Sequence, residues 1–153
     1  MVRGSSIGRN CVIGYNTEVA RSVLGDDVWT HSSYLGDSVL GHNISLGAGT
    51  TTGNLRLDEA EIGSTVQGKT IGTGRTKFGA VLGSDTRTGI HTCLAPGVKV
   101  GSGSFVNSMT MVTKDIPDGS FVKMKGLGDI DIRPNSKAAA DASARNAFRG
   151  KLK

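Results

Sequence analysis

A histidine and a tyrosine three residues apart, His31 and Tyr34, stand where the regular sequence pattern of the chain is interrupted. Histidine has an ordinary pKa of about 6.5, so a neutral imidazole is well suited to act as a general base near neutral pH. An amine that attacks a thioester must lose a proton, and one histidine could accept it. From spacing alone, an ordinary exposed turn residue is an equally good interpretation of His31.

The surrounding sequence repeats every six residues. From Leu82 it reads LGSDTR, TGIHTC, LAPGVK, VGSGSF, VNSMTM and VTKDIP, and the N-terminal half follows the same pattern from IGRNCV. The first residue of each six is mostly aliphatic, the second is usually small, and the fifth is small or β-branched. Neither the i, i+3, i+4, i+7 spacing of an amphipathic helix nor the alternation of a single strand fits this period.

A six-residue period is typical of a parallel β-helix. Three sixes close one triangular coil, the first and fifth residues point inward, and coils stack about 4.8 Å apart. We therefore predict an all-β, single-stranded parallel β-helix, with about five coils from residues 7–53 and 82–117. The glycines are expected at corners that need unusual backbone angles. A β-sandwich would not require this spacing.

Two segments depart from the pattern. Residues 1–132 are predicted to form the β-helix, with residues 54–81 as an insertion that leaves one corner. The insertion is either a functional contact or a short hairpin or extended coil. Residues 133–153 are predicted to be a basic C-terminal tail. An α-helix is expected there because small and apolar residues recur every four positions: Ala140, Ala144, Phe148 and Leu152.

The formal net charge of +5 comes from this tail. Residues 1–132 hold 12 basic and 12 acidic residues, whereas residues 133–153 hold six basic residues and one acidic residue. Nucleic-acid binding through the tail rests on charge alone, since no aromatic residues alternate with the basic ones, and a solvated face is expected instead. No apolar run has the length of a signal peptide or membrane span, so we expect no membrane association.

The other histidines and the cysteines suggest no metal site. His42 and His91 occupy outward positions of their sixes and are expected at the surface. A zinc site built from three histidines would show a His-x4-His spacing, which the sequence lacks. Cys11 and Cys93 form no Cys-x-x-Cys pair and are expected to be reduced thiols of a cytoplasmic protein.

The segment HSSYLGDSVLGHNISLGAGTTTGNLRLD carries a family resemblance. It resembles the acetyltransferase domain of the bifunctional UDP-N-acetylglucosamine pyrophosphorylase/glucosamine-1-phosphate N-acetyltransferase family, and more so its archaeal sugar-1-phosphate nucleotidylyltransferase relatives. Similarity spans roughly residues 7–125, and residues 31–54 are its specific part. The resemblance implies a left-handed β-helix that forms homotrimers, with acetyl-CoA and an amino-sugar phosphate bound in grooves between subunits.

The resemblance also implies roles for single residues. His31 matches the catalytic base, and Tyr34 matches a tyrosine that contacts the sugar phosphate. Asn54 matches an asparagine that reaches across the subunit boundary near the substrate. Three further residues match positions that contact the cofactor: Ala48 and Ser84 beside the acetyl-CoA arm, and Lys125 near the cofactor phosphates.

The sequence departs from the family where the sugar phosphate is held. Two lysines of the family are replaced by Ala20 and Ala60, and an asparagine is replaced by Ser45. Charge-assisted hydrogen bonds are the strong ones, so loss of two cations should weaken a phosphate site. Cations near the corner and in the insertion could compensate: Arg21, Arg56, Lys69, Arg75 and Lys77.

Two functions remain open at this point. The favoured one is an acetyl-CoA-dependent N-acetyltransferase acting on an amino-sugar 1-phosphate, with His31 as the base and no covalent enzyme intermediate. The alternative is a non-catalytic domain that trimerises a sugar-1-phosphate nucleotidylyltransferase. In either case, a nucleotidylyltransferase domain or subunit is an expected partner.

Overall fold

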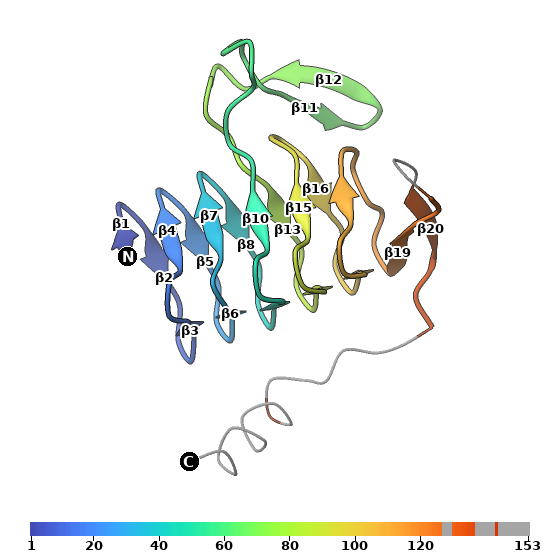
Figure 1. Ribbon diagram of the computed structural model, residues 1–153. Coiled ribbons are helices and arrows are strands. Elements are labelled where there is room, and N and C mark those ends of the chain that lie inside the picture. Colours follow the sequence, from blue (N-terminus) through green and yellow to red (C-terminus); the bar gives the residue numbers. More distant parts are fainter. Residues whose placement is uncertain (127–129, 137–142, 144–153) are drawn as a thin grey trace.

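The computed structural model describes residues 1–126, 130–136 and 143 of the chain. Its short strands stack into a β-helix with three faces (Figure 1). Strands of successive coils pair in parallel on every face, as the pairs Leu24–Leu40 and Arg87–Phe105 show. The fold is the predicted all-β, left-handed parallel β-helix.

The strands divide among the faces as follows. The first face contains β1 (Val2–Arg3), β4 (Glu18–Ala20), β7 (Tyr34–Gly36), β10 (Thr51–Thr52), β15 (Cys93–Leu94) and β18 (Met111–Val112). The second face contains β2 (Ser6–Ile7), β5 (Val23–Leu24), β8 (Val39–Leu40), β13 (Val81–Leu82) and β16 (Lys99–Val100). The third face contains β3 (Val12–Ile13), β6 (Trp29–Thr30), β9 (Ser45–Leu46), β14 (Arg87–Thr88), β17 (Phe105–Val106), β19 (Ser120–Met124) and β20 (Ile130–Pro134).

The interior is built from the two residue positions that the pattern predicts. The first residues of the sixes from Leu82 to Val112 are all buried. The fifth residues are also buried: Thr86, Thr92, Val98, Ser104, Thr110 and Ile116. The first face has six strands, so the whole helix makes about six coils, while the five predicted coils refer to residues 7–53 and 82–117 alone. Strand β1 precedes these two ranges, and β19 and β20 follow them.

The interruptions of the pattern are shorter coils. Val19 pairs with Leu35, 16 residues later, whereas Cys93 pairs with Met111, 18 residues later. The corner between β6 and β7 contains only residues 31–33, so His31 lies at a shortened corner, as predicted from the interruption.

The glycines at the second position of the sixes are required for close packing between coils, and not for unusual backbone angles as expected. A Cβ on Gly89 would lie 2.4 Å from the backbone nitrogen of Ser108 in the next coil, so these glycines allow the coils to stack closely. Positive φ angles at the corners occur at Asn and Asp, including Asp27 at 62° and Asp85 at 61°, and at glycines outside the second position, such as Gly49 at 76°. The expectation that unusual angles explain the glycines is therefore wrong for the second position of the sixes.

We expect Gly89→Ala to destabilise the coil by about 3 kcal/mol, because its Cβ meets backbone that cannot move aside alone. Gly53→Ala is the matched control, since its Cβ would meet a proline ring atom at 3.1 Å and the loss should stay below about 1 kcal/mol. Chemical denaturation of both variants checks the difference, and equal losses would contradict the packing explanation.

The insertion forms a hairpin of β11 (Gly63–Val66) and β12 (Lys69–Gly72), which projects from the coil between β10 and β13 (Figure 1). Ile62 is buried at its base, and Lys99 Nζ contacts Ser64 Oγ at 3.3 Å and the carbonyl of Thr65. The predicted C-terminal α-helix lies outside the described residues. Within the described ranges, the chain has no helix with the length and apolar character to cross a bilayer.

Candidate active site

Strand β7 connects the two corners that carry most of the predicted site residues. His31 precedes β7 at the corner between the third and first faces, and Asp37 follows it at the corner between the first and second faces. Six residues of extended chain span at most about 20 Å. A candidate base and a charged corner therefore lie at opposite ends of one strand.

The side chain of His31 is exposed on its corner. Its carbonyl oxygen accepts hydrogen bonds from Gly49 N at 3.2 Å and from Ser33 Oγ at 3.0 Å, which fix the backbone while the imidazole makes no hydrogen bond to any described residue. The bond from Gly49 places exposed Ala48 on the same corner, one coil away. Ser84 lies at the corner between the second and third faces, where its Oγ accepts a hydrogen bond from His42 N at 3.0 Å.

At the other end of β7, four side chains form a connected network. Arg21 binds Asp37 through two hydrogen bonds, Nε to Oδ1 at 2.6 Å and Nη2 to Oδ2 at 2.7 Å. Asn54 Nδ2 donates to Asp37 Oδ2 and to the Tyr34 hydroxyl, the latter at 3.2 Å. Sequence reasoning did not select Asp37, although it ends the Tyr-Leu-Gly-Asp motif that supports the resemblance.

This network perturbs both of its charged groups. The Arg21 guanidinium, followed by the Asn54 amide, holds the pKa of Asp37 below its ordinary value despite partial burial. Hydrogen bonding to Asp37 raises the pKa of Arg21 in return. Because the pKa of Asp37 is depressed in the folded chain, its contribution to stability is present above about pH 4 and is lost as the pH falls through the folded pKa.

Beside this network lies a groove of about 490 Å³. Its lining residues are Arg21, Val23, Asp37, Ser38, Val39, Arg75, Lys77 and Phe78. Asp37 neutralises Arg21, so Arg75 and Lys77 are the groove cations without a carboxylate partner among the described residues. The end of the insertion is held here by Phe78 N, which donates to the carbonyl of Asn54 at 3.1 Å.

Five cations could compensate for the two missing lysines of the family, and three of them, Arg21, Arg75 and Lys77, line this groove. The other two lie elsewhere, since Lys69 is on the hairpin strand β12 and Arg56 binds Asp58 at 2.8 Å within the loop. Ala20 is fully buried and pairs with Gly36 in β7, while Ala60 is exposed in the insertion.

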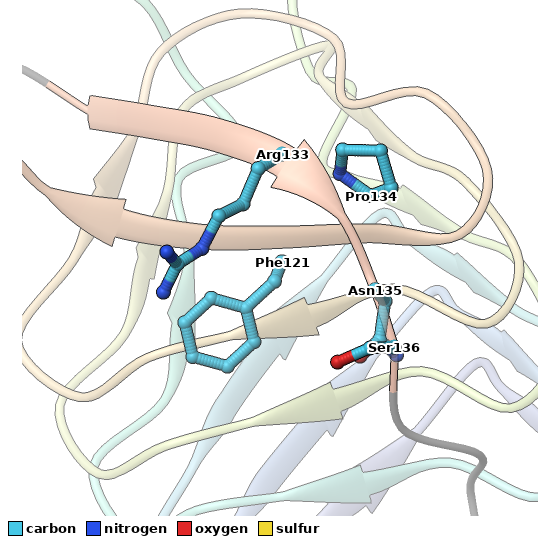
Figure 2. A pocket seen from close by; sticks show the side chains of 5 residues that line it. All are labelled: Phe121, Arg133, Pro134, Asn135 and Ser136. Atoms are coloured by element: carbon cyan, nitrogen blue, oxygen red, sulfur yellow. The ribbon is translucent and has the colours of Figure 1, made fainter.

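A second cavity, of about 360 Å³, lies at the C-terminal end of the third face. Figure 2 shows the side chain of Arg133 beside the ring of Phe121, and the guanidinium carbon lies 5.4 Å from the ring centroid. These two residues pair across β19 and β20. Lys125, predicted to meet the cofactor phosphates, is exposed beyond the opposite end of β19 and does not line this cavity.

The remaining histidines and cysteines occupy ordinary structural positions. His42 and His91 are exposed, as predicted, and His42 Nδ1 accepts a hydrogen bond from Asp26 N at 3.0 Å. Cys11 and Cys93 are free thiols. In the part of the chain that the structure describes, no three His, Cys, Asp or Glu side chains are grouped to hold a metal ion.

Comparisons with known proteins find relatives of this chain among bifunctional proteins. It is 40% identical over 124 residues to "Bifunctional protein GlmU" of Methanococcus vannielii, covering 81% of this chain and 26% of that protein. It is 41% identical over 75 residues to the bifunctional sugar-1-phosphate nucleotidylyltransferase/acetyltransferase of Sulfurisphaera tokodaii, covering 49% and 19% of the two chains. The chain is related to these bifunctional proteins over one part of their length. It spans about a quarter of the length of its Methanococcus relative.

The fold also matches solved acetyltransferases. The acetyltransferase domain of PglB from Neisseria gonorrhoeae, in complex with acetyl coenzyme A, has a TM-score of 0.62 and 20% sequence identity. The match covers 87% of this chain and 53% of that one, and at this identity it supports the fold alone. No family model matches the chain.

Proposed function

We propose that this chain is an acetyl-CoA-dependent N-acetyltransferase that acts on an amino-sugar 1-phosphate. The observation that carries the proposal is the arrangement along β7, with an exposed imidazole at one end and a cationic groove at the other. An amino-sugar 1-phosphate carries its nucleophilic amine on C2 and its phosphate dianion on the neighbouring C1, so in this proposal the imidazole of one chain meets the groove of a neighbouring chain around one acceptor. The Sulfurisphaera tokodaii relative, which is named for a sugar 1-phosphate and for acetyl transfer, supports this acceptor.

In the proposed reaction, His31 accepts a proton from the acceptor amine. The amine lone pair attacks the thioester carbonyl carbon and forms the new C–N bond. When the tetrahedral intermediate collapses, the C–S bond breaks, and the imidazolium returns its proton to the leaving thiolate. General-base assistance of this kind contributes typically a hundredfold to ten-thousandfold in rate.

The phosphate would bind Arg75 and Lys77 at the groove. In this proposal these two residues take over the role of the two family lysines, whose positions are occupied here by Ala20 and Ala60. Both residues line the groove, and neither is bound to a carboxylate among the described residues. Tyr34 and Asn54, joined by a hydrogen bond, would orient the sugar. Arg21 acts indirectly, since its guanidinium is bound to Asp37.

We expect binding of the acetyl-CoA phosphates to depend on Arg133 more than on Lys125, because Arg133 lines the cavity at the end of the third face and lies over the ring of Phe121, whereas Lys125 does not line this cavity. Arg133→Ala should raise the KM for acetyl-CoA about tenfold, the loss of one charge-assisted hydrogen bond. Lys125→Ala should change this KM less than twofold. Steady-state kinetics measures both values. A larger increase of this KM in Lys125→Ala than in Arg133→Ala would instead support the role of Lys125 that the family resemblance implies.

We further propose a homotrimer. Exposed apolar side chains gather at the corner that carries His31: Tyr15 at 96%, Ile90 at 51% and Met109 at 64% exposure. A second chain packed on this corner would cover them and enclose the imidazole. Light scattering tests the assembly against the chain mass of 15.8 kDa, with three times that value expected.

Titration calorimetry with acetyl-CoA, followed by acetyl-transfer assays on glucosamine 1-phosphate and galactosamine 1-phosphate, tests the function. Binding and turnover would support the enzyme. Absence of binding at millimolar acetyl-CoA would favour the alternative, a non-catalytic domain that assembles a nucleotidylyltransferase, and Ala20 and Ala60 are the observation in its favour.

A further inference from the structure

The hydrogen bonds among Arg21, Asp37, Asn54 and Tyr34 determine the orientation of the Asn54 side-chain amide. We propose that Asp37 is a positioning residue that fixes the Asn54 side chain, so that Asn54 offers the acceptor substrate an oxygen and not an N–H group. This inference rests on the proposed function for the identity of the ligand, but the orientation itself follows from contacts within the chain.

A carboxylate can only accept hydrogen bonds, so the group of Asn54 that contacts Asp37 Oδ2 must be its NH2 group. The same nitrogen lies 3.2 Å from the Tyr34 hydroxyl oxygen. An amide nitrogen carries two hydrogens, and these two bonds use both of them. The Asn54 oxygen has no hydrogen-bond donor among the described residues and is left for a ligand.

The orientation of Asn54 also sets the polarity of Tyr34. Its hydroxyl oxygen accepts a hydrogen bond from Asn54, so the phenolic hydrogen is available to donate elsewhere. The pair therefore presents one acceptor and one donor. A matching ligand places a hydroxyl or amine opposite Asn54 and an oxygen, such as a phosphate oxygen, opposite Tyr34.

Asp37 is itself held in place. The side chain is only 12% exposed, and the two-point contact with Arg21 fixes both carboxylate oxygens. Gly36 leaves room for the arrangement, because a Cβ there would lie 2.6 Å from both Asn54 Nδ2 and the Tyr34 hydroxyl. The titratable and charged groups near Asp37 are Arg21 and Tyr34 from the coil and Lys77 from the insertion.

The test compares Asp37→Asn with Asp26→Asn. Asp26 is a matched control, because it also binds an arginine of the preceding coil, Arg9, but at a different corner. Asparagine at position 37 can donate as well as accept, so Asn54 is free to rotate. We expect Asp37→Asn to raise the KM for glucosamine 1-phosphate at least tenfold, with the KM for acetyl-CoA unchanged, while Asp26→Asn changes neither.

A second readout does not depend on turnover. In NMR spectra of the wild-type chain, both side-chain amide hydrogens of Asn54 should exchange slowly with solvent, and Asp37→Asn should accelerate this exchange while Asp26→Asn does not. Rapid exchange in the wild type, or an unchanged acceptor KM in Asp37→Asn, would overturn the inference. Slow exchange without any acetyl transfer would leave the positioning intact and refute the proposed function instead.

Discussion

His31→Ala should lower kcat for acetyl transfer by about a hundredfold to ten-thousandfold, because the amine then has no group to take its proton. The KM for acetyl-CoA should change little. The fold should survive, since the imidazole is exposed and the hydrogen bonds at this residue involve its backbone carbonyl. Stopped-time assays of CoA release check the rate, and circular dichroism checks the fold.

The matched control for this experiment is His42→Ala. His42 is an exposed histidine at another corner, where its ring accepts a hydrogen bond from Asp26 N. Its removal should leave kcat unchanged. If turnover persists at the wild-type rate in His31→Ala, the general-base assignment is wrong, whatever the substrate proves to be.

The double variant Arg75→Ala/Lys77→Ala should raise the KM for the acceptor by about a hundredfold or more. A hydrogen bond to a charged group contributes about 1.5–3 kcal/mol, and each 1.4 kcal/mol is a factor of ten. Both residues lie on the insertion and outside the coil strands, so stability should change little. Steady-state kinetics with varied glucosamine 1-phosphate measures the effect.

Lys114→Ala serves as the control for general loss of positive charge, since Lys114 is exposed and lies outside the groove. We expect its acceptor KM to match the wild type. An unchanged KM in the Arg75/Lys77 double variant would mean that the phosphate binds elsewhere, and Lys69 on the hairpin would then be the next residue to test.

The coil could be predicted from the sequence because its interior repeats with a fixed period. Buried positions such as Leu94 and Thr92 recur in every coil, so a local pattern specifies them without knowledge of distant contacts. The role of the glycines was less accessible, because it depends on how closely the next coil approaches, as at Gly89.

The site was only partly predictable, for a related reason. His31 and Tyr34 belong to one strand and its corner, and the interrupted pattern located them. The groove combines this strand with Arg75 and Lys77, which follow a hairpin whose path the repeat does not determine. Asp37 was missed because its importance depends on contacts with partners 16 and 17 residues away.

Acetylation of glucosamine 1-phosphate, compared with glucosamine that lacks the phosphate, tests the central claim most directly. Mass spectrometry should show one N-acetyl group on the sugar phosphate for each CoA released, with kcat/KM at least tenfold lower for glucosamine. If neither sugar is acetylated, or if both are acetylated with equal efficiency, the proposed roles of the His31 imidazole and of the cationic groove are contradicted.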